Sequence, residues 1–312
     1  MVSIFPLITI FAPLLGTLLI SLFWRDLGDR VARLGIAALW CSALTSLATL
    51  AVVLSGDTIQ LALIGAQSGA MTYTVMVDRL AAVMMALISL VSLIIHVYSE
   101  RYMVGDAGYV RFFALLGGLT FVLLSLVSSG NLFWLFVCWH LVTWLLATLL
   151  VCNPDSRAAR DAGQKTFWVQ SFGDAAFAVA LLVLYGSYGT WDMTDLFARL
   201  QAAPALLTVW PGLQWECDVP LVVTLLLVLS VMTKSAQFPF HFWLIGTIEA
   251  PTPVSALMHA GIVNAGGFLV NRLAPLFGLA PTTLHLMFVI GGITALIGAT
   301  AMLTQTSVKR RL

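Results

Sequence analysis

Nine apolar runs dominate the sequence and fit a lipid bilayer better than any water-soluble fold. A helix needs roughly 17–25 apolar residues to cross the hydrocarbon core, and all but one of the runs reach that length. Only 9% of the 312 residues are charged, whereas a soluble domain carries about 25%. Because backbone polar groups in lipid must be satisfied internally, we predict an all-α polytopic membrane protein with about nine transmembrane helices. The runs cover residues 4–24, 34–54, 80–98, 112–128, 132–152, 167–185, 219–234, 254–274 and 283–303.

Most of the fifteen lysine and arginine residues fall on one side of the predicted bundle, in the segments that follow the first, third, fifth and ninth runs. Basic segments remain on the cytoplasmic side of a membrane. We therefore expect the N-terminus outside and the C-terminus in the cytoplasm. The first run has no basic segment before it and no small-residue cleavage site behind it, which predicts a retained helix rather than a signal peptide.

Composition argues against several kinds of site. The net charge of +1 gives no reason to expect binding to nucleic acid. The four cysteines are scattered without a Cys-x-x-Cys pair, so the sequence predicts neither a metal site nor a disulfide framework. No pairing of a nucleophile with a base, no phosphate-binding loop and no haem-ligand pattern is present. We expect no cofactor in this chain.

The segment 232–260 carries the most informative residues. Lys234 ends an apolar run, where a charge is costly unless it is paired or solvated. Pro239 lacks a backbone donor and breaks any helix that continues past it. His241, Glu249 and His259 follow. Broken helices with ionisable groups at membrane depth line protein interiors or water-filled cavities, so the segment predicts a path for ions or protons.

Two further runs each carry one ionisable residue. His140 lies about ten residues into the run 132–152, and histidine is the side chain that titrates nearest physiological pH. It is either part of a proton path or a neutral histidine bonded to a neighbouring helix. Asp174 lies inside the run 167–185 and has no partner on its own helix. Lys234 or His140 is the expected partner, and a protonated carboxyl with one hydrogen bond is the alternative.

The third run ends in a group of polar and aromatic residues. His96 and Glu100 lie four residues apart, which places them on one face of a helix. They form either an interfacial anchor or an entry or gating point for protons. The pair Asp78 and Arg79 at the other end of this run is expected to be an interfacial anchor. We expect a short hairpin between residues 56 and 77, and an aromatic interfacial segment without a site between residues 186 and 218.

These residues carry a resemblance to a known family. The segment 233–260, with Lys234, two prolines before Val254 and then His259, resembles the antiporter-like membrane subunits. These subunits occur in respiratory NADH–quinone oxidoreductases (NuoL type), Mrp sodium/proton antiporters (MrpA type) and inorganic-carbon uptake complexes (DabB type). Shorter matches occur at 96–103, 108–113, 173–174 and 304–310, so the resemblance covers nearly the whole chain from Asp78.

The resemblance implies a five-helix repeat with a broken helix. The chain would divide into helices 1–2 with an exterior loop (1–77), helix 3 with a cytoplasmic loop (78–110), the repeat of helices 4–8 (111–276), and helix 9 with a basic end (277–312). Lys234 would be the central proton carrier, His259 part of the relay beyond it, and Asp174 the acid of the regulatory or entry region. The resemblance also implies a location in the cell inner membrane.

Three features depart from the family pattern. Respiratory and Mrp-type members have a glutamate where this chain has His140, and NuoL-like chains commonly have a basic residue where this chain has Ser171. The second inverted repeat has barely begun where the sequence ends, as expected of a short form or of a piece of a longer protein. The absence of the glutamate favours the DabB-type branch.

The favoured function is therefore a proton-conducting subunit that couples the proton gradient to uptake of CO2 or bicarbonate. Its expected partner is a cytoplasmic zinc-binding subunit similar to carbonic anhydrase (DabA type), and the zinc is expected in that partner. One alternative is a divergent subunit of a redox-driven proton pump or of a sodium/proton antiporter. A second alternative is a scaffold subunit that conducts nothing.

Overall fold

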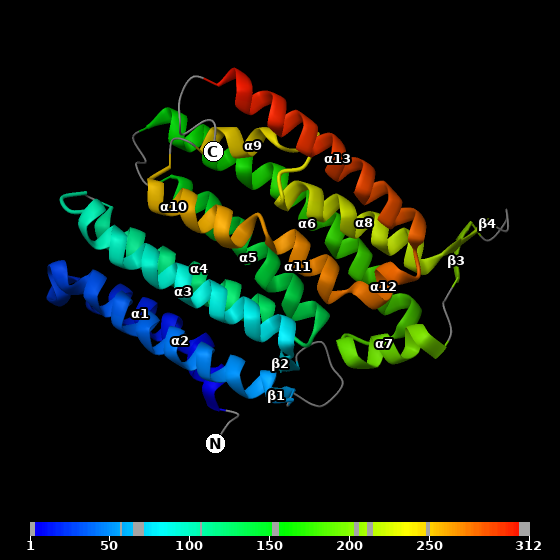
Figure 1. The fold of residues 1–312 in the computed structure, drawn as a ribbon, viewed down its shortest axis with the longest axis horizontal. Coiled ribbons are helices and arrows are strands. Elements are labelled where there is room, and N and C mark those ends of the chain that lie inside the picture. The colour runs from blue at the N-terminus through cyan, green and yellow to red at the C-terminus, as the bar shows by residue number, and fades with distance from the viewer. Residues whose placement is uncertain are drawn as a thin grey trace.

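The computed structural model describes residues 4–56, 58–64, 72–106, 108–151, 156–202, 206–210, 215–247 and 250–305. Long helices run side by side in a slanted bundle (Figure 1). Within these residues, eight helical segments are long and apolar enough to cross a membrane, and a sixteen-residue apolar helix adds a ninth, which confirms the prediction of about nine. The long helices are α1 (Ile4–Leu27), α2 (Val31–Leu54), α3 (Arg79–Tyr102), α4 (Tyr109–Val127), α5 (Leu132–Leu150), α6 (Arg157–Tyr188), α8 (Val219–Lys234) and α13 (Pro281–Thr304).

The remaining span is a composite of short segments. It consists of α10 (Thr252–Leu257), the π-helical η3 (Met258–Ile262) and α11 (Ala265–Arg272), and it leads into α12 (Ala274–Gly278). The Val263 N–H donates to the Met258 carbonyl at 3.0 Å, the i→i−5 bond that defines a π-turn. The Asn264 side chain donates to the carbonyls of His259 and Ala260 at 3.1 and 3.3 Å. The sequence did not predict this interruption, because the run 254–274 was read as one continuous helix.

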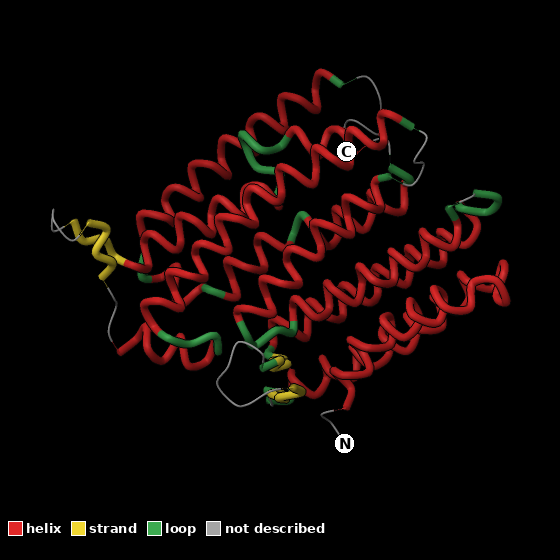
Figure 2. The backbone as a smooth tube through the Cα atoms, turned by 180° about the vertical axis from the view of Figure 1, so that it is seen from behind, coloured by secondary structure: helices red, strands yellow, loops and turns green. Residues whose placement is uncertain are grey.

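One end of the bundle carries small elements between the long helices. They are the antiparallel hairpin β1–β2 (Ile59–Ile64, Tyr73–Val77), the helix α7 (Met193–Ala202) and the antiparallel hairpin β3–β4 (Leu206–Trp210, Trp215–Asp218). Both hairpins lie at the end where α1 begins, and α13 ends at the opposite end (Figures 1 and 2). The first hairpin confirms the prediction for residues 56–77. The second hairpin and α7 were not predicted.

The long helices begin and end at specific capping residues. Asn131 caps α5 by accepting from the N–H groups of Phe133 and Trp134. The Ser156 hydroxyl caps α6, and Gly189 ends it at φ +66°, a left-handed conformation that glycine adopts without a steric penalty. These caps fix the start of α5 and both ends of α6, the two helices that carry His140 and Asp174.

Small residues allow the helices that surround Lys234 to pack closely, as is common in membrane bundles. Helix α8 packs against α6 on one side and against α11, α12 and α13 on others. At the crossing of α6 and α8, a Cβ added to Gly173 would overlap the side chain of Thr233. On α11, a Cβ added to Gly266 would overlap Ser235 and Val231. These two glycines set how closely α6 and α11 approach α8.

We predict that Gly173→Ala destabilises the protein by about 1–3 kcal/mol, the usual cost of overpacking. The added methyl group must displace Thr233, the neighbour of Lys234. Gly186→Ala on the same helix is the control, because no atom lies within 4 Å of its added Cβ and alanine favours helix. The midpoint of denaturant-induced unfolding, measured in detergent, compares the stabilities of the two variants. Equal midpoints for the two variants would contradict close packing at Gly173.

Candidate functional site

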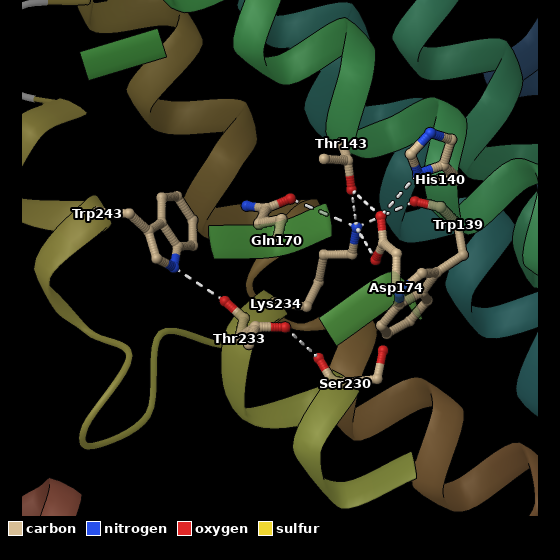
Figure 3. A network of polar contacts seen from close by, with 9 residues as sticks. All are labelled: Trp139, His140, Thr143, Gln170, Asp174, Ser230, Thr233, Lys234 and Trp243. Atoms are coloured by element: carbon tan, nitrogen blue, oxygen red, sulfur yellow. Dashed lines mark hydrogen bonds and ion pairs between the residues drawn. The ribbon is translucent and has the colours of Figure 1, made fainter. Parts of the chain in front are cut away.

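Three helices bring their polar side chains together around Lys234 (Figure 3). The ammonium group donates to the Trp139 carbonyl at 3.0 Å, to the Thr143 hydroxyl, and to Gln170 Oε1 at 3.4 Å. Asp174 Oδ1 lies 3.4 Å from Nζ, and the Lys234 side chain is 1% exposed. Trp139 and Thr143 belong to α5, Gln170 and Asp174 to α6, and Lys234 to α8. The cation is thus held by oxygen atoms from two neighbouring helices.

Lys234 lies at the end of α8 and next to an aromatic ring. The helix ends at this residue, and the carbonyl end of a helix carries partial negative charge that attracts a cation. The ammonium lies 4.9 Å from the centre of the Trp139 ring, within the range of a cation–π interaction. These contacts offset part of the cost of removing the charge from water.

Asp174 is shared between a lysine and a histidine. Its Oδ1 faces Lys234, whereas its Oδ2 accepts from the Thr143 hydroxyl at 2.7 Å and lies 3.0 Å from His140 Nδ1. The Thr143 hydroxyl donates its one proton to Asp174 and accepts from Lys234. A hydroxyl has one donor and two acceptor lone pairs, so it can make both hydrogen bonds at once. The expectation that Lys234 or His140 pairs with Asp174 is confirmed, since both do.

His140 connects this buried pair with the side of the bundle. Its side chain is 46% exposed, compared with 3% for Asp174. Its ring lies 6.5 Å from those of Phe136 and Phe167, measured between centroids. The His140 ring therefore reaches the side of the bundle while it stays bonded to the buried carboxylate.

The chain after α8 is irregular, as Pro239 predicted. The helix ends at Lys234, and Ala236 has φ +50°. The short helix α9 (Phe242–Gly246) then supplies Trp243, whose indole N–H donates to the Thr233 carbonyl at 2.9 Å. The Ser235 hydroxyl donates to the Val263 carbonyl at 2.7 Å, next to the π-turn. Side chains thus supply hydrogen bonds to the backbone carbonyls of Thr233 and Val263.

The other predicted residues lie apart from this network. Pro239 and His241 are in the irregular segment, where His241 stacks on Phe238 with centroids 6.1 Å apart. His259 is exposed on η3 and is not among the hydrogen-bond partners given above for Lys234. Glu249 lies outside the described residues. Their roles in a proton path remain predictions.

His96 and Glu100 do not form a pair. The His96 ring is buried among α1–α4, whereas Glu100 lies 3.5 Å from Arg33 at the surface. Asp78 caps α3 and accepts from Arg272 Nη1 at 2.9 Å, although Arg272 is distant in the sequence. The role of Asp78 and Arg79 as an interfacial anchor stays a prediction.

Three participants were missed by the sequence analysis. Thr143 follows Trp139 by four residues and His140 by three, and Gln170 precedes Asp174 by four. Such spacing places side chains on one helix face, so a search for polar residues one turn from His140 and Asp174 would have found both. No comparable signal exists for Trp243, which reaches Thr233 across the irregular segment.

Among the described residues, no group of three or more His, Cys, Asp or Glu side chains could hold a metal ion.

We predict that Asp174→Asn lowers the free energy of unfolding by about 3–5 kcal/mol, because it leaves the buried Lys234 without its counter-charge. In the double variant Lys234→Met/Asp174→Asn most of that loss is recovered, since no unpaired charge remains. A double-mutant cycle on unfolding in detergent measures the coupling. Additive effects of the two substitutions would contradict a direct pair.

Comparisons with known proteins identify the family of this chain. The family described as "NADH:quinone oxidoreductase/Mrp antiporter, TM" matches residues 129–312, and "NADH-Ubiquinone oxidoreductase (complex I), chain 5 N-terminus" matches residues 64–113. The probable inorganic carbon transporter subunit DabB1 of Halothiobacillus neapolitanus is 41% identical over 309 residues, which cover 96% of this chain and 52% of that protein. Subunit L of the NADH-quinone oxidoreductase of Rhodobacter capsulatus is 36% identical over 320 residues, covering 97% and 44%.

Solved structures share the fold at low sequence identity. A chain of the membrane-bound sulfane sulfur reductase, an archaeal respiratory membrane complex, matches with a TM-score of 0.83 and 19% identity, over 98% of this chain and 61% of that one. A chain of the Mrp complex from Dietzia sp. DQ12-45-1b matches with a TM-score of 0.78 and 22% identity, over 99% and 32%. The chain spans about half the length of the curated relatives described above. This multi-pass membrane protein belongs to the NADH:quinone oxidoreductase/Mrp antiporter transmembrane family.

Proposed function

We propose that this chain conducts protons, with Lys234, Asp174 and His140 as its central exchange site. The observation that carries the proposal is the sharing of Asp174 between a buried lysine and a half-exposed histidine. Ionisable groups at membrane depth are expensive to keep, and where they occur they commonly serve ion or proton pathways. An inert bundle would gain more stability from apolar side chains at these positions.

The geometry supports a coupled exchange of protons. When His140 is protonated, its positive charge attracts Asp174 and weakens the attraction between Asp174 and Lys234. Burial then disfavours the charged lysine, so Lys234 releases a proton. When His140 loses its proton, Asp174 favours the charged lysine again. The charge on a half-exposed residue thereby controls the charge on a buried one.

The remaining ionisable groups complete the proposed path. We assign to His241 and His259, in the irregular segments after α8 and within the eighth span, the steps beyond Lys234. Glu249 is a candidate for the same route by its sequence position, and His96 and Glu100 are candidates for entry or gating. We place the protein in the cell inner membrane with the N-terminus outside and the C-terminus in the cytoplasm. The two ends of the described chain lie at opposite ends of the bundle, as this orientation requires.

We propose that proton flow through this chain drives the uptake of CO2 or bicarbonate. The relative named as a probable inorganic carbon transporter subunit is 41% identical over nearly the whole chain. His140, where the resemblance implies a glutamate in respiratory and Mrp-type members, supports the same branch. A cytoplasmic zinc-binding subunit similar to carbonic anhydrase would be the partner and would hold the zinc. The likeness to subunit L of NADH-quinone oxidoreductase supports the alternative of a divergent pump or antiporter subunit.

We predict that Lys234→Met reduces proton flux at least tenfold in proteoliposomes that contain the protein with its co-purified partners. Methionine keeps the length of the side chain and removes the exchangeable proton. Lys165→Met is the matched control, because Lys165 is exposed at the start of α6. Flux should be measured with a pH-sensitive dye trapped inside the vesicles. Unchanged flux in Lys234→Met with assembly intact would instead favour a scaffold.

We predict that purification in mild detergent recovers a large soluble zinc-containing protein bound to this chain. Mass spectrometry identifies the partner and elemental analysis measures the zinc. Recovery of quinone-reductase or antiporter subunits without such a protein would overturn the inorganic-carbon assignment. It would leave the proton site itself unaffected, because Lys234→Met tests that site separately.

A further inference from the structure

A second polar cluster lies in the α1–α4 part of the bundle and includes none of the side chains that hold Lys234. Its centre is His96, which is 0% exposed. His96 Nδ1 lies 2.9 Å from the Ser92 carbonyl oxygen. Because a carbonyl can only accept, this bond assigns the ring proton to Nδ1 and leaves a lone pair on Nε2 in the neutral ring. Nε2 therefore needs a donor.

No protein group within the described part of the chain supplies that donor. His96 Nε2 is buried and without a hydrogen-bond partner there. The ring borders a cavity of about 10 Å³ between α1, α2, α3 and α4, lined by Thr17, Gly35 and Gly117 among others. A cavity of about 10–15 Å³ is the smallest that holds one water molecule. The position and size of this cavity suit a single water at Nε2.

The cavity depends on a glycine and offers a second polar group. A Cβ added to Gly35 would lie 3.4 Å from His96 Cδ2 and 3.9 Å from Nε2, so any side chain there would fill the space beside the ring. Thr17 Oγ1 donates to the Ala114 carbonyl at 3.3 Å and keeps lone pairs that can accept from water. A water molecule in the cavity could thus donate to Nε2 and to Thr17.

We propose that His96 binds a buried water molecule in this cavity, and that the hydrated histidine is a polar site separate from Lys234. The water donates one hydrogen to Nε2 and its other hydrogen to Thr17 Oγ1. Nδ1 is committed to the Ser92 carbonyl, so Nε2 is the ring atom that binds the water. The charged groups of the neighbouring turns, Glu100 and Arg33, lie at the surface and pair with each other.

Nitrogen-15 NMR of the full chain in lipid bilayers tests the proposal. The sequence has only five histidines, so selective labelling gives few signals, and His96→Gln identifies the one from His96. We expect magnetisation transfer from water to the His96 ring, and an Nε2 shift typical of a hydrogen-bonded acceptor. Gly35→Ala should reduce this transfer at least fivefold, because its methyl group occupies the cavity. Gly292→Ala on α13, where nothing lies within 4 Å of the added Cβ, should leave it unchanged.

Two results would overturn the proposal: no transfer from water to His96 in the unmodified protein, or equal transfer in Gly35→Ala and the control. If Gly35→Ala fails to fold, Thr17→Val provides the test, because it keeps the volume and removes the second partner of the water. Its expected result is weaker transfer to His96, and unchanged transfer would count against the site. Lys234→Met should leave the His96 signal as it is, which distinguishes this water site from the site at Lys234.

Discussion

The buried ammonium group of Lys234 is the interaction on which this structure depends. A lysine without water around it requires several oxygen atoms and a counter-charge. Here they come from α5 and α6, through the Trp139 carbonyl, Thr143 and Asp174. Three helices must therefore meet at one point. The glycine at the crossing of α6 and α8 allows them to approach closely enough for these contacts.

A second constraint is the satisfaction of backbone groups wherever helices are interrupted. Lipid offers no replacement hydrogen bonds, so side chains supply them. The Trp243 indole serves the Thr233 carbonyl and Asn264 serves two carbonyls of the π-turn. In α1, Pro13 has no N–H for the Thr9 carbonyl, and the Ser42 hydroxyl donates to it at 2.7 Å instead. Side-chain hydrogen bonds thus replace the missing backbone bonds in the irregular segments.

The sequence predicted the features that follow from composition and from local residue patterns. Apolar runs located the helices, and the cost of a buried charge singled out four residues, Lys234, Asp174, His259 and His140. The structure brings Lys234, Asp174 and His140 together, whereas His259 lies apart. Tertiary contacts could not be predicted in the same way. Arg272 reaches Asp78 across most of the chain, and His96 turns inward, away from the surface pair that Glu100 forms with Arg33. Helical spacing alone does not say which neighbour a side chain will contact.

In the proposed mechanism, His140 controls the charge on Lys234 through Asp174. Nitrogen-15 NMR of the lysine side chains in lipid bilayers tests it directly, because the sequence contains only three lysines, Lys165, Lys234 and Lys309. We expect His140→Gln to change the Lys234 signal, as Asp174→Asn does, whereas His285→Gln on α13 leaves it unchanged. A Lys234 signal that is the same with and without His140 would show that His140 does not control the charge on Lys234.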